Sequence, residues 1–222
     1  MSAVIVLDLE AVTVPWWSPP PDKPDAFAPS CAWRIVCACA LVIGDGVPAM
    51  HTFTGDERKI LIGLRGLLAG ATQIVTFKGR TYDVPVIMAR SFVHGVEQPW
   101  YYDAEKRYER DPRFRYGNRR AAHLDLYEQL GDFGAMNPGR LDDVARALGL
   151  DGKGDTKGSD VAGMFERGEL AAIARYCSRD VLVTALAWAR WCLLVGDADE
   201  ARTEKREAWI RGALESAEVA GD

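Results

Sequence analysis

The stretch Ala3–Glu10 reads AVIVLDLE and joins an apolar, β-branched run to two acids at its end. Such a run is typical of a buried strand, and we predict a β-strand over Ala3–Leu9. Side chains of a strand alternate between the two faces of a sheet, so Asp8 and Glu10 share one face. Two like charges held this close repel each other unless water, a proton or a cation relieves them. The alternative is a strand that simply ends in solvent.

The segments that follow predict an antiparallel meander. Residues 11–32 hold six of the eleven prolines, which indicates an irregular loop because proline fixes φ and lacks a backbone donor. Trp33–Ile43 is apolar enough for a second, buried strand. A glycine turn at 44–46 then leads into a third strand over Ala49–Thr54.

The remainder of the chain alternates strand and helix signals. Gln73–Phe77, a glycine turn and a helix over Tyr82–Val93 indicate a parallel βα unit, and His123–Leu126 predicts a further strand. The other expected helices are one that Asp56 caps and that runs to about Leu68, a short one ending at Leu130, Leu141–Leu148, Ser159–Gly168, Leu170–Val195 and 199–217. We therefore predict one α/β domain with a mixed sheet over residues 1–195, followed by a charged helical extension over 196–222.

Composition narrows the class of protein. Of the 222 residues, 48% are apolar and 27% charged, which argues against disorder and allows a sizeable core. The net charge of −5 leaves room for a local basic patch but not for a large basic face. The five cysteines include no C-x-x-C pair, so neither a disulfide framework nor a cysteine zinc site is indicated. Without a recognisable signal peptide or membrane helix, we expect a cytoplasmic protein with no membrane partner.

Two further aspartates, Asp83 and Asp180, are candidates for a functional site because of the residues around them. Asp83 follows a strand and a glycine turn, where it could also serve as a helix N-terminal acid favoured by the helix dipole. Tyr176 and Asp180 are four residues apart and so share one helix face. An aspartate beside an apolar helical run is costly unless it is paired or bound to a metal. A salt bridge from Asp180 to Arg175 or Arg179 is the alternative.

Together these motifs resemble the DEDD, or DnaQ-like, superfamily of 3′–5′ exonucleases. The D-x-E motif corresponds to Asp8–Glu10, the T-F-N-G-x-x-[FY]-D-x-P motif to Thr76–Pro85, and the Y-x-x-x-D motif to Tyr176–Asp180. The chain is more narrowly similar to predicted exonucleases related to the proofreading domain of family B DNA polymerases, and its tyrosine places it in the DEDDy branch. The resemblance spans about residues 3–195. It implies an RNase H-like fold, with a five-stranded sheet of three antiparallel and then parallel strands flanked by helices.

The resemblance also implies a reaction. It is metal-dependent hydrolysis at the 3′ end of single-stranded DNA, releasing nucleoside 5′-monophosphates with two Mg²⁺ or Mn²⁺ ions per site. Asp8, Glu10 and Asp180 would hold the first ion, Asp8 would bridge to the second, and Asp83 would reach the second mainly through water. Tyr176 would orient the attacking water, because a phenol is a poor base at neutral pH.

Several residues are candidates for substrate binding. The resemblance places Lys78 and Tyr82 of the second motif at the substrate, although the family usually has asparagine where this chain has Lys78. Residues 100–120 interleave seven cations with six aromatic rings, a mixture that suits single strands because cations track phosphates and rings stack on bases. The alternative is a solvated loop. The preferred cations in it are Arg113, Arg115, Arg119 and Arg120.

Rival functions remain open at this point. RNA could replace DNA as the substrate, since a contact to the 2′-hydroxyl leaves no trace in the sequence. Proofreading or DNA repair would require a separate polymerase or repair partner. The fold could also serve as a catalytically degenerate nucleic-acid-binding module, or the acids could hold a purely structural cation.

Overall fold

The computed structural model describes residues 3–44, 46–101, 123–150 and 158–219. Its centre is a five-stranded sheet in the order β3-β2-β1-β4-β5. The strands are β1 (Ala3–Thr13), β2 (Trp33–Ile43), β3 (Ala49–Thr54), β4 (Ala71–Thr76) and β5 (His123–Asp125). The first three pair antiparallel, and β4 pairs parallel with both β1 and β5. This arrangement confirms the predicted mixed α/β sheet.

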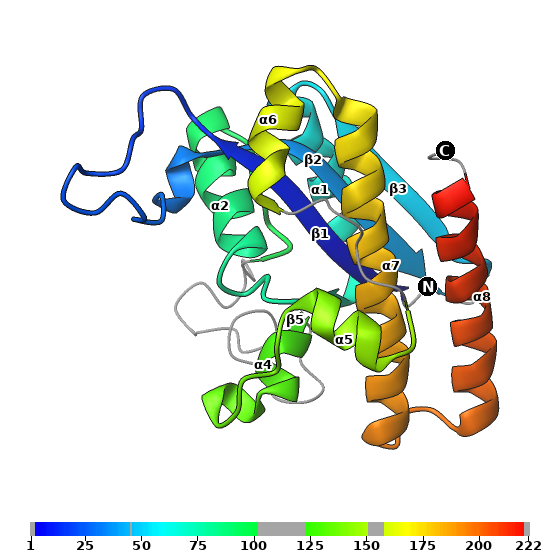
Figure 1. Cartoon of the computed structure of the whole chain (residues 1–222). Helices are drawn as coiled ribbons and strands as arrows, with labels where there is room; N and C mark the ends of the chain where they lie inside the picture. The colour runs from blue at the N-terminus through cyan, green and yellow to red at the C-terminus, as the bar shows by residue number, and fades with distance from the viewer. Residues whose placement is uncertain (1–2, 45, 102–122, 151–157, 220–222) are drawn as a thin grey trace, which may run out of the picture.

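Helices cover both faces of the sheet. The α-helices are α1 (Glu57–Leu68), α2 (Asp83–His94), α4 (Leu126–Leu130), α5 (Leu141–Ala147), α6 (Val161–Glu166), α7 (Leu170–Leu194) and α8 (Glu200–Val219). Short 3-10 turns lie at η1 (Ser30–Ala32), η2 (Asp132–Gly134) and η3 (Gly158–Asp160). The long helix α7 crosses one face with α8 beside it, while α1 and α2 lie on the opposite face (Figure 1).

The central strand β1 is buried on both sides. Val6 packs in the cluster that contains α7, whereas Ile5 and Leu7 pack in the cluster that contains α1 and α2. A strand covered on both faces is apolar at every position, which explains the unbroken run at its start. Ile210 and Leu214 of α8 belong to the α7 cluster, and the proposed boundary between residues 195 and 196 stays a prediction.

The strand β1 continues to Thr13, beyond the predicted end at Leu9. Its pairing with β2 persists to Thr13↔Trp33 across an irregularity between Glu10 and Ala11. The proline-rich segment begins only after this point, and its Trp17 packs against a small buried cluster near β2. Among the described residues, no helix combines the length and the hydropathy needed to cross a bilayer.

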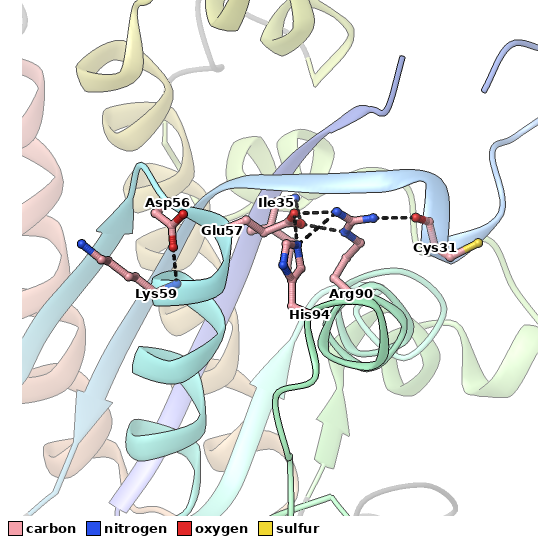
Figure 2. Close-up of polar contacts among 7 residues, drawn as sticks. All are labelled: Cys31, Ile35, Asp56, Glu57, Lys59, Arg90 and His94. Atoms are coloured by element: carbon pink, nitrogen blue, oxygen red, sulfur yellow. Dashed lines mark hydrogen bonds and ion pairs between the residues drawn. The ribbon is translucent and has the colours of Figure 1, made fainter. Parts of the chain in front are cut away.

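A buried ion-pair network ties α1 and α2 to β2 and to the η1 turn before it (Figure 2). The Glu57 carboxylate accepts hydrogen bonds from the Ile35 backbone at 2.7 Å and from the Arg90 guanidinium at 2.6 and 2.8 Å. The His94 ring lies 2.7 Å away, and Arg90 also donates to the Cys31 carbonyl at 2.8 Å. Burial raises the pKa of Glu57, but the bonds from Arg90 and Ile35 outweigh it, so the pKa lies below its ordinary value.

Candidate active site

Asp8 and Glu10 lie on the sheet face that α7 covers. They stand opposite Cys39 and Cys37 of β2, which belong to the α7 cluster. Both acids are half-buried, and their carboxylate oxygens lie within 4.8 Å of each other. The period-two prediction therefore holds, and the strand carries its two acids inward rather than into solvent.

Asp83, the first residue of α2, reaches the same strand. The backbone N–H of Leu9 donates to its Oδ1 at 3.1 Å. This donor is available because the parallel pairing with β4 stops at Val6. Burial, reinforced by the charges of Asp125 and Asp180, raises the pKa of Asp83 to about 7. Those charge effects place Asp180 near Asp83.

The helix α7 brings the third motif to the acids. The Cys177 thiol lies within 4.8 Å of the carboxylates of Asp8 and Glu10 and donates to the Asp8 carbonyl at 3.4 Å. Asp180 follows one turn later and is only 6% exposed. A Cβ added at Gly158 would lie 4.0 Å from the Tyr176 hydroxyl, so this phenol borders the η3 turn.

These residues suit a hard divalent cation. Asp8, Glu10, Asp83 and Asp180 come from β1, α2 and α7 and converge in one place, where the first two are half-buried and the last two are buried. Carboxylate oxygens are the ligands that Mg²⁺ and Mn²⁺ prefer. Burial drives Asp83 toward protonation, and a cation bound beside it would stabilise its ionised form.

A family model for predicted 3′–5′ exonucleases related to the exonuclease domain of PolB matches residues 25–221. The chain belongs to this family. It is accordingly a 3′–5′ exonuclease by class, a hydrolase of phosphodiester bonds. The match begins after β1, so Asp8 and Glu10 join the site on the geometry above rather than on the match.

Solved structures show the fold of this exonuclease in larger proteins. The family B DNA polymerase from the hyperthermophilic archaeon Pyrobaculum calidifontis is 18% identical, with a TM-score of 0.60 over 87% of this chain and 25% of the polymerase. Exonuclease I is 12% identical, with a TM-score of 0.51 over 91% of this chain and 42% of its own. The chain thus spans less than half of either protein. No curated protein matches it by sequence.

The exonuclease departs from the family pattern at Lys78, and the structure shows what this position requires. Lys78 has a φ of +71°, a left-handed conformation that asparagine adopts more readily than lysine. At the next residue, a Cβ on Gly79 would lie 2.6 Å from the Thr76 side chain, so only glycine fits. The Lys78 ammonium lies 5.2 Å from the ring centre of Tyr127, and its side chain is exposed.

Asp125 braces the turn that carries Lys78. It is 1% exposed and accepts from the backbone N–H groups of Lys78 and Arg80, both at 2.8 Å. A third bond comes from the Tyr127 backbone at 3.0 Å. Asp125 therefore fixes the turn of the second motif that precedes Asp83.

Two hollows flank Lys78 on the exonuclease surface. One of about 370 Å³ is lined by Phe77 and Arg140, and one of about 520 Å³ by Phe133 and Met136, while Lys78 and Tyr127 line both. Phe133 and Met136 are exposed. These hollows bring rings and cations together around Lys78 of the second motif.

The other predicted substrate residues have separate outcomes. Tyr82 is half-buried and packs edge-on to Trp33, with ring centres 5.6 Å apart. Burial and the charges of Asp83, Glu10 and Asp8 raise its pKa. Arg113, Arg115, Arg119 and Arg120 lie outside the described residues.

Sequence reasoning missed Cys177 as a neighbour of the acids. No C-x-x-C pair marks this cluster, because Cys37 and Cys39, the partners of Cys177, are two residues apart on a strand. The usable signal was their period of two, which places both thiols on one face. Pairing β2 with β1 then sets that face beside Asp8 and Glu10.

Proposed function

We propose that the chain hydrolyses single-stranded DNA from its 3′ end, with two divalent ions, and releases nucleoside 5′-monophosphates. The observation that carries this proposal is the convergence of Asp8, Glu10, Asp83 and Asp180 from three separate elements. Family membership supplies the class of reaction and its direction. DNA rather than RNA is favoured by the relation to a DNA polymerase domain.

Different sets of these acids would bind the two ions. Asp8, Glu10 and Asp180 would hold one Mg²⁺ or Mn²⁺, and Asp8 with Asp83 the other, with Asp83 acting mainly through water. Such a pair, when bound, supplies an acidified water and stabilises charge on the leaving oxygen. Asp83 keeps its position through the bond from the Leu9 backbone.

The single strand would lie along the side of the site where Lys78 stands. Lys78 donates hydrogen bonds and would contact a phosphate of the strand. The rings that line the hollows beside it offer stacking surfaces, and Tyr82 would border the terminal nucleotide. Arg113, Arg115, Arg119 and Arg120 would extend the contact to the strand. A separate polymerase or repair protein would use this activity for proofreading.

Digestion of labelled oligonucleotides tests the function. With Mg²⁺ or Mn²⁺, a 5′-labelled single strand should shorten stepwise, and a 3′-labelled strand should release its label as a mononucleotide. A chelator or a blocked 3′ terminus should stop the reaction. Matched RNA tested in parallel distinguishes an exoribonuclease. Failure to cut either polymer with either metal would contradict the proposal and favour a binding module.

Changing Tyr176 to phenylalanine tests the orienting role. Loss of one hydrogen bond to the attacking water is expected to lower kcat by about 10²-fold, the usual cost of a removed positioning group. Stabilisation of the protein by Mn²⁺ should persist, because the phenol is not a metal ligand. Ser216→Ala, which removes an exposed hydroxyl on α8, is the control. A fully active Tyr176→Phe protein would refute the role.

A further inference from the structure

Three cysteines form a compact cluster in the core behind the acids. Cys37 and Cys39 of β2 and Cys177 of α7 are each fully buried, and their sulfur atoms all lie within 4.8 Å of one another. The Cys37 and Cys39 sulfurs are 3.9 Å apart, and all three cysteines are free thiols. Cys177, at least 138 positions further along the chain than Cys37 and Cys39, thus brings a third thiol to theirs.

The spacing of the sulfurs is that of a metal site. Zinc binds thiolates at about 2.3 Å in a tetrahedron, which separates the sulfurs by about 3.8 Å. The observed spacing therefore requires only small side-chain movements around an ion. Hydroxyl groups are also at hand: Ser178 Oγ lies 3.3 Å and Thr52 Oγ1 3.7 Å from the Cys39 sulfur. Such groups orient thiolate ligands by donating hydrogen bonds to them.

The cluster adjoins the acidic centre through Cys177. The same sulfur lies within 4.8 Å of the carboxylates of Asp8 and Glu10, so Cys177 is shared by the three-thiol group and the acidic group. Because these acids are half-buried and the three thiols are not exposed, an ion would enter from the acidic side. Cys177 therefore stands between hard oxygen ligands on one side and soft sulfur ligands on the other.

We propose that Cys37, Cys39 and Cys177 bind a thiophilic ion such as Zn²⁺ or Cd²⁺. This ion inhibits the exonuclease by recruiting Asp8 or Glu10 as an additional ligand. Each thiol that coordinates releases its proton to solvent as the sulfur–metal bond forms, and no electron is transferred. Sulfur ligands select such ions over Mg²⁺. The binding site stands on the cluster itself, whereas the inhibition rests on the proposed function.

Titration of the metal-free 222-residue chain with Cd²⁺ tests the site directly. One equivalent should produce the ultraviolet charge-transfer band of cadmium thiolate, and excess Mg²⁺ should not remove it. Cys37→Ala and Cys39→Ala should each weaken Cd²⁺ binding by at least about tenfold, whereas Cys192→Ala, at a buried cysteine elsewhere, should not. Thermal melting verifies that each variant is folded. Absence of the band in the wild type, or its persistence in both cluster variants, would overturn the site.

The inhibition needs a second measurement. Zn²⁺ should suppress Mg²⁺-supported hydrolysis by the wild type, a chelator followed by fresh Mg²⁺ should restore it, and Cys37→Ala should need at least about tenfold more Zn²⁺. Equal inhibition of the wild type and the variant would overturn the inhibitory role while leaving the binding site. If no hydrolysis occurs under any condition, the proposed function fails, and the charge-transfer titration still decides the thiol site.

Discussion

Replacing Asp8 with asparagine is expected to lower kcat for removal of 3′-terminal nucleotides by about 10³-fold or more, which corresponds to about 4 kcal/mol of transition-state stabilisation. The proposed site uses this carboxylate for both ions, so one substitution affects both halves of the mechanism. The amide is nearly the same size but carries no charge, and Mg²⁺ and Mn²⁺ bind it more weakly.

The fold should survive this substitution. The bond that links Asp8 to α7 is made by its backbone carbonyl, which asparagine retains. Removing a charge beside Glu10 and near Asp83 also relieves repulsion in the metal-free protein. Single-turnover digestion of a labelled strand, with Glu204→Gln on the exposed side of α8 as the control, measures the effect. Comparable rates for Asp8→Asn and the control would remove Asp8 from the mechanism.

The elements of this fold were predictable where a local pattern decides them. Trp33–Ile43 and Ala49–Thr54 are found at their predicted bounds, because apolar runs with turn residues at their ends leave little choice. The end of β1 was not predictable in this way. Ala11 to Thr13 are ordered as a strand by their partners on β2, a long-range pairing that the local residues do not encode.

In the candidate site, too, relations set by local spacing were predictable and those set by long-range pairing were not. Spacing placed Asp8 with Glu10, and Tyr176 with Asp180, because a strand and a helix fix those relations locally. The sequence suggested that Asp125 braces the fold near the site, but it could not identify the bonds to the Lys78 turn, since these depend on the pairing of β4 with β5. The cysteine cluster was hidden for the same reason.

Replacing Glu57 with glutamine is expected to destabilise the protein by about 3–5 kcal/mol, the cost of leaving one member of a buried ion pair without its partner. Glu57 and Arg90 are 5% and 6% exposed, so solvent cannot replace the lost charge. The pair at the surface, Arg65 and Glu97, is the matched control, and Glu97→Gln should cost no more than about 1 kcal/mol. Urea unfolding of both variants measures the difference in the free energy of unfolding.

The pH dependence of stability separates this charge effect from a simple packing defect. The pKa of Glu57 lies below its ordinary value of 4.5 in the folded state, so its stabilising contribution is present above about pH 4.5 and is lost as the pH falls through the folded pKa. The stability gap between wild type and Glu57→Gln should therefore narrow in acid. Arg90→Met combined with Glu57→Gln should cost less than the sum of the single changes, because neither partner is then left as an isolated charge. A gap that stays constant with pH, together with additive single changes, would show that Glu57 stabilises the fold by packing alone.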